Sequence, residues 1–474
     1  MKIWRFFKGA VALYLIYALV GAALLPALPK KVSEKTKKEF SMDHYLGKGQ
    51  GPDRVLLVED PARGFDIRIA LISEAKKTLD ISTHCVEWGT TAEYFFAALL
   101  DAADRGVQIR MVNDGMIGGM RGQKDILYAL AQHPNITYYE YNPLDPLRPD
   151  TWNQRLHDKY LLCDDRLLLL GGRNIGDKYF NSFGFQGAVS NDRDVLVYCP
   201  GSSKESVLPQ VRDYMDSVLA QPCTNPAVKK PLSAKQARLA SAARGRLADA
   251  LAALRGLRPE LFENAADWAA VTVPTAKVTL VANPTAPTKK EPVIGYVMAR
   301  LAQNARRSVT LQSPYTVAHA PMRKVFTRVA GQIDDFTLLT NSLASTPNLP
   351  AFSNYLSTRG KLLETGVTIK EYQGTDSIHA KAFLMDERLC GVGSMNLDER
   401  SLYLDTETML IIDSTDFYLQ LSQAVGEIEA RSLTVDQSRG YLPAEDARPQ
   451  KVSVLKAFLF YTAAFLTRPL GYLI

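Results

Sequence analysis

The chain has 474 residues, of which 46% are hydrophobic and 22% are charged, and its formal net charge is +6. These values exclude a disordered chain and indicate a folded globular protein that is long enough for two domains. The modest positive charge favours an anionic partner, either lipid headgroups or nucleic acid. The five cysteines are scattered without metal-ligand spacing, so we expect buried thiols rather than a disulfide framework or a metal site.

The N-terminal segment is uncharged from residue 9 to residue 29 and follows a short basic stretch. This length just suffices to cross a bilayer, but the segment could equally be a signal peptide cleaved near the small residues 21–23. We therefore predict a signal or transmembrane anchor over 1–29 and a basic linker over 30–54. Positive charge flanks both ends, and the richer C-terminal flank favours a cytoplasmic body over a periplasmic one.

Beyond the linker, two halves of the chain repeat the same plan of strands and helices. Residues 75–82 resemble 305–312, and residues 135–141 resemble 366–372; each of these segments has the pattern of a strand. Helical patterns such as that of residues 92–105 connect other strands, so both halves are predicted to be α/β. Duplication of a whole domain explains the repeat.

The duplication sets the predicted domain boundaries, with one copy over 55–220 and the other over 273–430. Residues 221–272 between them are predicted to be a helical linker, because leucines recur there at helical spacing. The tail, 431–474, contains an apolar run between Lys456 and Arg468 that is too short to span a bilayer. We expect an interfacial helix on the membrane there, or else a helix docked on the protein's own core.

One spaced pattern of polar residues occurs once in each half. In both copies a lysine follows a histidine by two positions, an aspartate follows by seven and an asparagine by seventeen. Two matches in one chain without a register error indicate a shared function. The first copy consists of His157, Lys159, Asp164, Gly172 and Asn174, and the second of His379, Lys381, Asp386, Ser394 and Asn396.

These residue types suit chemistry at a phosphate ester. Histidine can act as a nucleophile or carry a proton near neutral pH. Lysine supplies a point cation for phosphate oxygens, and asparagine supplies a neutral donor beside it. Two copies brought face to face would flank a tetrahedral phosphorus with a nucleophile on one side and a leaving group on the other.

The paired motif resembles that of the phospholipase D superfamily, H-x-K-x(4)-D followed by G-[SG]-x-N, and the resemblance covers residues 55–414. It implies an α/β fold of two tandem phospholipase D-like domains, each a mixed β-sheet flanked by helices, packed about a pseudo-twofold axis around one shared active site. It also implies that one histidine, taken as His157, forms a phosphohistidine while His379 protonates the leaving alcohol. The two lysines and two asparagines would hold the phosphate oxygens, and no metal or other cofactor is implied.

In this superfamily a further carboxylate in each half orients the histidine. From their positions on the strand after each motif, we assign Glu407 in the second half and Asp194 in the first. The motif aspartates Asp164 and Asp386 lie across a strand from their histidines and are expected to be structural. Gly172 and Ser394 are assigned to the phosphate-binding loop.

Two other histidines, His84 and His319, follow strands that are equivalent in the two halves. We expect structural roles for them rather than roles in lining a pocket, because nothing else around them is repeated.

Within the superfamily, the segments HPNITYYEYNPLD, GGRNIGDKYF and GSMNLDERS resemble bacterial cardiolipin synthases of the C type. This resemblance implies a phosphatidyltransferase at the bacterial inner membrane, with phosphatidylglycerol as a substrate and phosphatidylethanolamine as a further candidate. A phospholipase D that releases phosphatidic acid is the nearest alternative, because only exclusion of water separates the two outcomes. A nucleic-acid phosphodiesterase is a more distant alternative, since the apolar chain ends favour lipid, and the oligomeric state is left open.

Overall fold

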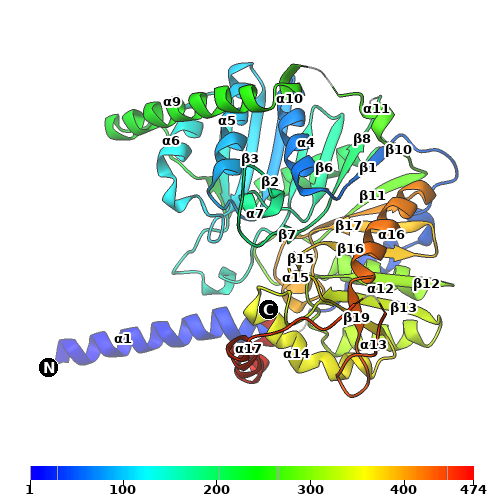
Figure 1. Cartoon of the computed structure of the whole chain (residues 1–474). Coiled ribbons are helices and arrows are strands. Elements are labelled where there is room, and N and C mark those ends of the chain that lie inside the picture. Colours follow the sequence, from blue (N-terminus) through cyan, green and yellow to red (C-terminus); the bar gives the residue numbers. More distant parts are fainter. Residues whose placement is uncertain (1, 29, 202, 264–265, 446, 474) are drawn as a thin grey trace.

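The computed structural model describes residues 2–28, 30–201, 203–263, 266–445 and 447–473. Met1 and Pro29, the two ends of the predicted anchor, lie outside the described residues. Two layered α/β units lie one above the other, and an N-terminal helix projects away from them (Figure 1).

The first unit is built on a mixed sheet of nine strands in the order β10-β1-β8-β6-β5-β2-β3-β4-β9. The strands are β1 (Arg54–Val58), β2 (Thr78–Thr83), β3 (Gln108–Asp114), β4 (Ile136–Tyr141), β5 (Tyr160–Cys163), β6 (Leu167–Gly171), β8 (Asp194–Tyr198), β9 (Thr224–Pro226) and β10 (Val273–Pro274). The accompanying helices are α4 (Pro61–Glu74), α5 (Thr90–Asp104), α6 (Lys124–Gln132), α7 (Asp177–Phe180), α8 (Val207–Leu219), α9 (Ala234–Leu257), α10 (Glu260–Glu263) and α11 (Trp268–Val271), with the short turns η3 (Met120–Gly122) and η4 (Pro149–Thr151).

The second unit has eight strands in the order β11-β18-β17-β16-β12-β13-β14-β19. Its strands are β11 (Lys277–Ala282), β12 (Ser308–Gln312), β13 (Asp335–Asn341), β14 (Thr368–Tyr372), β16 (Lys381–Met385), β17 (Leu389–Gly393), β18 (Thr408–Asp413) and β19 (Ser432–Thr434). Its helices are α12 (Val293–Gln303), α13 (Ala320–Ala330), α14 (Leu349–Leu363), α15 (Glu399–Tyr403) and α16 (Thr415–Glu429). Apart from β10, the strand order repeats that of the first sheet position by position, which confirms the predicted fold of two mixed α/β units.

Three hydrophobic cores hold these layers together. One lies on the outer side of the first sheet, and it includes Leu247, Leu251 and Leu254 of α9, so the helix predicted as a connector packs into the first unit. Another lies on the outer side of the second sheet, under α12, α13 and α14. The third joins the two units, because residues of both motif hairpins, such as Leu168 and Val392, are buried in it together. The two inner faces therefore meet in a continuous core, while the exact domain boundaries stay a prediction.

The chain ends lie against each other on one side of the molecule. The N-terminal helix consists of α1 (Lys2–Leu19), η1 (Val20–Leu24) and α2 (Leu25–Ala27), and α3 (Glu34–Glu39) and η2 (Met42–His44) follow in the linker. The C-terminal tail forms α17 (Val454–Thr467) and η5 (Arg468–Leu473), and α17 packs along α14. The hydroxyl of Tyr472 donates to the carbonyl of Ala23 over 2.8 Å, which ties the two ends together.

Candidate active site

The two motif histidines lie where the two units meet, each at the start of the hairpin that its motif forms. His157 precedes β5, and His379 lies between the short strand β15 (Ser377–Ile378) and β16. Each is positioned by a parallel pairing with the other unit: Ile378 pairs with Asn191 of β7 (Ser190–Asn191), and Leu156 pairs with Thr406. The residue before each histidine is thus held by a segment of the opposite unit.

The same pairings place one carboxylate from the opposite unit on each histidine. Nδ1 of His157 lies 2.9 Å from Oε1 of Glu407, and Nδ1 of His379 lies 2.5 Å from Oδ2 of Asp192. A carboxylate on Nδ1 fixes the ring orientation and leaves Nε2 free for chemistry. Since each pair contains one residue from each unit, neither motif forms a site by itself.

The prediction that Asp194 orients a histidine is wrong. Asp194 accepts hydrogen bonds from the buried guanidinium groups of Arg68 and Arg173, each over 3.0 Å. Sheet register explains the error: Asp194 lies opposite Gly171 as Met409 lies opposite Gly393, so the counterpart of Glu407 is two residues earlier, at Asp192.

The two motif lysines are buried beside the histidines. Nζ of Lys381 lies 2.9 Å from Nδ1 and 3.2 Å from Nε2 of His379, and Nζ of Lys159 donates to the backbone carbonyl of His157. Burial lowers the pKa of Lys159 to about 8, and it also lowers the pKa of Lys381. An anion placed beside a buried ammonium group stabilises its charge, so this pair of lysines could bind an anionic group.

The pKa values of the histidines are lowered for the same reasons. Burial, and next the charge of Lys381, lowers the pKa of His379 to about 4. Burial and Lys159 lower the pKa of His157 well below its ordinary value, with Lys381 and His379 of the other unit adding to the effect. Without a bound anion both rings are therefore neutral at neutral pH, which suits a nucleophile or a proton acceptor, and a ring that acts as an acid must first gain a proton.

The two orienting carboxylates differ in charge. Burial raises the pKa of Glu407 well above its ordinary value, so burial favours the protonated, neutral form of Glu407 beside the neutral ring of His157. Burial would also raise the pKa of Asp192, but Lys381 and His379 together hold it well below its ordinary value. The two halves are thus similar in geometry and different in electrostatics.

Gly172 and Ser394 of the motifs lie in direct contact with these carboxylates. The hydroxyl of Ser394 donates to Oε2 of Glu407 over 2.5 Å. At Gly172 a Cβ atom would come within 2.1 Å of Oδ1 of Asp192, so the first half has no room for the corresponding side chain. The Gly-Gly and Gly-Ser variants are therefore fitted to different carboxylates.

The motif asparagines have unused polar atoms at the site. The side-chain oxygens of Asn174 and Asn396 are buried without a hydrogen-bond partner. The amide of Asn174 donates to the hydroxyl of Tyr179 over 3.2 Å, whereas Asn396 is held through its backbone nitrogen, which donates to Ser401. A buried polar group without a partner is expected to bind a ligand or water, and a half-turn of the amide would present its donors instead.

The motif aspartates lie at turns away from the histidines. Asp164 and Asp386 have φ angles of 52° and 53°. Asp164 accepts hydrogen bonds from the backbone nitrogens of residues 76–78, and Asp386 accepts them from residues 306–308. Both carboxylates fasten the hairpin turn to the start of a neighbouring strand.

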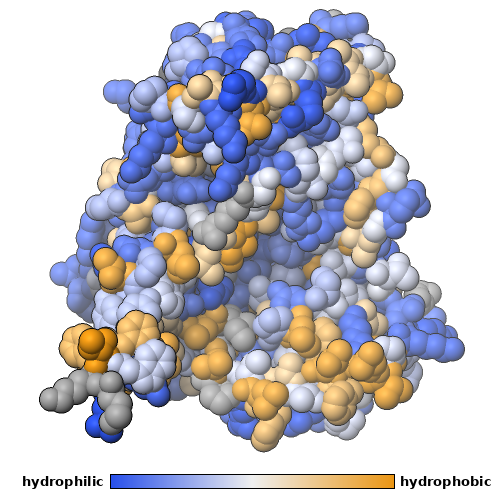
Figure 2. Space-filling model, turned by 90° about the vertical axis from the view of Figure 1, so that its left-hand side faces the viewer, coloured by the Kyte–Doolittle hydropathy of each residue, from blue (hydrophilic) through white to orange (hydrophobic). Residues whose placement is uncertain are grey.

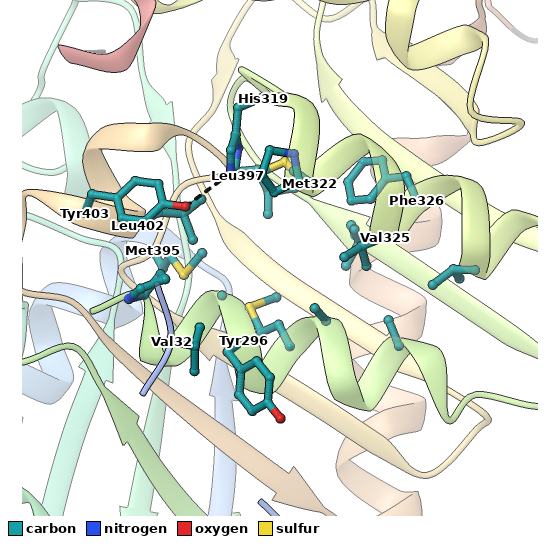
Figure 3. A pocket seen from close by; sticks show the side chains of 18 of the residues that line it. Val32, Tyr296, His319, Met322, Val325, Phe326, Met395, Leu397, Leu402 and Tyr403 are labelled. Atoms are coloured by element: carbon teal, nitrogen blue, oxygen red, sulfur yellow. Dashed lines mark hydrogen bonds between the residues drawn. The ribbon is translucent and has the colours of Figure 1, made fainter. Parts of the chain in front are cut away.

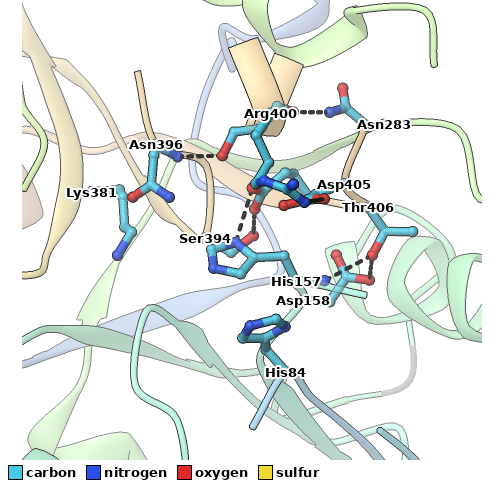
Figure 4. Close-up of polar contacts among 12 residues, drawn as sticks. His84, His157, Asp158, Asn283, Lys381, Ser394, Asn396, Arg400, Asp405 and Thr406 are labelled. Atoms are coloured by element: carbon cyan, nitrogen blue, oxygen red, sulfur yellow. Dashed lines mark hydrogen bonds and ion pairs between the residues drawn. The ribbon is translucent and has the colours of Figure 1, made fainter. Parts of the chain in front are cut away.

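His84 is a site residue for which we expected only a structural role. Its ring lies edge-on to that of His157, with 4.8 Å between the ring centroids, and its Nδ1 lies 2.6 Å from the carbonyl oxygen of Leu156 (Figure 4). His157 thus has a histidine of its own half against its ring, whereas the ring of His379 lies 6.2 Å from that of Tyr179, which comes from the first half. Among the residues that the structure describes, no group of three or more His, Cys, Asp or Glu side chains could hold a metal ion.

Two fused units that share one crossed histidine site define a protein of the phospholipase D class. A family model described as cardiolipin synthase, PLD-like domain, matches residues 68–197 and 298–428, so the chain belongs to that family. At this level it is an enzyme of phospholipid metabolism, and the predicted resemblance is confirmed.

Individual proteins are similar to most of this chain. Cardiolipin synthase C of Escherichia coli strain K12 is 27% identical over 395 residues, which cover 75% of this chain and 80% of that protein. An uncharacterized protein of Helicobacter pylori strain J99 is 24% identical over 401 residues, covering 76% of each chain. The crystal structure of phosphatidylserine synthase from Haemophilus influenzae Rd KW20 matches with a TM-score of 0.59 and 13% identity over 86% of this chain and 92% of that one, a likeness of fold.

Proposed function

We propose that this protein is a membrane-associated phosphatidyltransferase that makes cardiolipin from phosphatidylglycerol. The observation that carries the proposal is the crossed pair of histidine–carboxylate contacts, His157 with Glu407 and His379 with Asp192, beside two buried lysines. The relationship to cardiolipin synthase C supports the choice of lipid.

The reaction follows from this geometry in two displacements. Binding of the anionic phosphate beside His379 favours the protonated form of that ring. Nε2 of His157 then attacks the phosphorus of a donor phospholipid, the bond from phosphorus to the leaving alcohol breaks, and protonated His379 gives that alcohol its proton. In the second displacement His379 takes the proton of the acceptor hydroxyl, and the acceptor oxygen attacks phosphorus as the bond to His157 breaks. Lys159 and Lys381 stabilise the charge on the phosphate oxygens, with Asn174 and Asn396 as neutral donors. His157 is assigned as nucleophile by analogy with the superfamily.

The chain ends support a membrane location. One helix, Ile3–Ala27, is long and apolar enough to cross a membrane, and it is only 11% buried. The exposed side of α17 carries Phe458, Leu466 and Phe465, the last of these 81% exposed. The face of the molecule on the side of α1 is hydrophobic mainly along its lower part (Figure 2). We propose that α1 is a transmembrane anchor and that α17 lies in the membrane interface.

The anchor also contacts the segment that leads into the site. Tyr14 and Tyr17 donate to the carbonyls of Pro146 and Leu147, over 3.0 and 2.7 Å. Gly21 is buried, and a Cβ atom there would lie 2.9 Å from the backbone nitrogen of Asp150. These contacts support an anchor that is retained, rather than cleaved, in the mature protein. We place the catalytic body on the cytoplasmic side of the inner membrane, and a C-terminal fluorescent or phosphatase fusion tests that placement.

The direct test is incubation of purified full-length protein with labelled phosphatidylglycerol, with and without phosphatidylethanolamine, and separation of the products. Cardiolipin with released glycerol is the expected product, and cardiolipin with released ethanolamine would identify phosphatidylethanolamine as donor. Phosphatidic acid alone would show a hydrolase, for which the 26% exposure of the His379 side chain leaves access to water. Absence of lipid turnover would overturn the proposal.

A further inference from the structure

An apolar cavity of about 210 Å³ lies in the second unit, between α12, α13 and the sheet (Figure 3). Its walls include Met298 of α12 and Met322, Val325 and Phe326 of α13. At one end the hydroxyl of Tyr403 lies 3.4 Å from Nε2 of His319. The flexible methionine side chains allow such walls to adapt to an irregular apolar occupant.

The cavity shares a wall with the catalytic loop. Met395 and Leu397 line it on either side of Asn396 in the sequence, and Leu402 of α15 lines it as well. The neighbouring residue of that helix, Ser401, accepts a hydrogen bond from the backbone nitrogen of Asn396 over 3.2 Å. A molecule bound in the cavity would therefore pack against the loop that holds Asn396 in the site.

The cavity also lies beside the segment that follows the membrane anchor. Val32, three residues beyond Pro29, is one of its lining residues. Lys289 donates to the carbonyls of Pro26 and Leu28, and its ammonium lies 5.1 Å from the ring centroid of Tyr403. The apolar space is thus flanked by a cation at the point where the anchor ends, an arrangement that suits a lipid with an anionic headgroup.

We propose that this cavity binds one acyl chain of the phospholipid on which the catalytic site acts. This inference rests on the proposed function and adds to it a site for the hydrocarbon part of the substrate. A chain in the cavity would pack against Met395 and Leu397 and so brace the loop that presents Asn396 to the phosphate.

Photolabelling tests occupancy without requiring turnover. Full-length protein in nanodiscs is irradiated with phosphatidylglycerol that carries a diazirine on an acyl chain, and adducts are mapped by mass spectrometry. We expect adducts on α12, α13 and residues 395–403, also in the His157→Ala variant. Val325→Trp, which fills the cavity, should abolish them, and Ala302→Phe from the facing helix should do the same. Thr327→Trp, at an exposed position of α13, is the matched control that should keep them.

Kinetics then test whether the bound chain belongs to the substrate. With monomeric short-chain phosphatidylglycerol, each methylene placed in the cavity should improve KM by up to about fourfold. Val325→Trp should therefore raise KM more for the dioctanoyl lipid than for the dihexanoyl lipid, by up to about fourfold for each methylene that it displaces, and leave kcat within about twofold.

Three results would overturn the inference. Adducts confined to α1 and α17, with phosphatidylglycerol still converted, would show that the cavity does not bind the acyl chain, while the proposed function would still hold. Adducts in the cavity with KM independent of chain length would show a resident lipid instead of the substrate. Adducts in the cavity without any lipid turnover would remove the substrate assignment together with the proposed function.

Discussion

At the scale of single residues, the most informative contrast is between Asp192 and Asp194, which are two positions apart and both buried. Asp192→Asn should lower kcat by roughly 10²–10⁴-fold, because an amide cannot stabilise the tautomer and charge of His379 as a carboxylate does. Its thermal unfolding should remain cooperative.

Asp194→Asn should lower the stability of the protein and leave its activity nearly unchanged. It removes the charge that compensates the buried Arg68 and Arg173, so we expect a loss of about 3 kcal/mol in the free energy of unfolding. Activity per folded molecule should stay within a few-fold of the unaltered protein. Chemical denaturation and measurement of kcat on both variants test these two predictions. A large loss of kcat in Asp194→Asn and of stability alone in Asp192→Asn would show that Asp194 is the orienting carboxylate.

The pH dependence is set by residues that burial has shifted. Because Lys159 has a pKa of about 8, it loses its charge above that pH and kcat/KM should fall there. Bound phosphate favours the charged lysine, so the alkaline limb of kcat should lie at higher pH than that of kcat/KM. Lys159→Arg stays charged throughout and should lose the limb near pH 8; a limb that persists in this variant would contradict the assignment.

At the scale of elements, the two motif loops should not be interchangeable. Gly172→Ser places a side chain against Asp192 and should displace it from His379, with a loss of kcat of about 10²-fold or more. Ser394→Gly removes only the hydrogen bond to Glu407 and should cost about tenfold in kcat. Equal effects of the two substitutions on kcat would show that the close approach at Gly172 does not matter.

The interfacial assignment of α17 gives a prediction for one helix. Phe465→Glu introduces a charge at an exposed apolar position, whereas Phe460 is buried against α14. The substitution should lower activity on vesicles by about tenfold and leave activity on monomeric short-chain lipid unchanged, because only the first substrate requires contact with a bilayer. A parallel loss on both substrates would indicate that α17 has a structural role alone.

The sequence patterns predicted the strands correctly, but they did not predict which side chains of the two units contact each other. The apolar runs of the motifs predicted the strands β5, β6, β16 and β17, and the repeat predicted two equivalent sheets. Glu407 was found from its strand position, but Asp192 was missed because it lies in an irregular loop just before β8, whose longer connection hides the register. The crossing of the carboxylates between units depends on how two sheets pack, which no local pattern in either half encodes.

At the scale of the whole molecule, one site made from two units should respond as a unit to loss of either histidine. His157→Ala and His379→Ala should each lower turnover by at least about 10³-fold, and the double variant should be no worse than the more damaged single one, because both displacements require both rings. The intermediate should differ between them: after a quench in denaturant at alkaline pH, which preserves the phosphorus–nitrogen bond, mass spectrometry should find a phosphatidyl adduct on His157 in the His379→Ala variant and none on His379 in the His157→Ala variant. An equimolar mixture of the two single variants should stay inactive, since each molecule carries one damaged site. Near-normal turnover by either variant would refute the shared site, and adducts found only on His379 would reverse the roles of the two histidines.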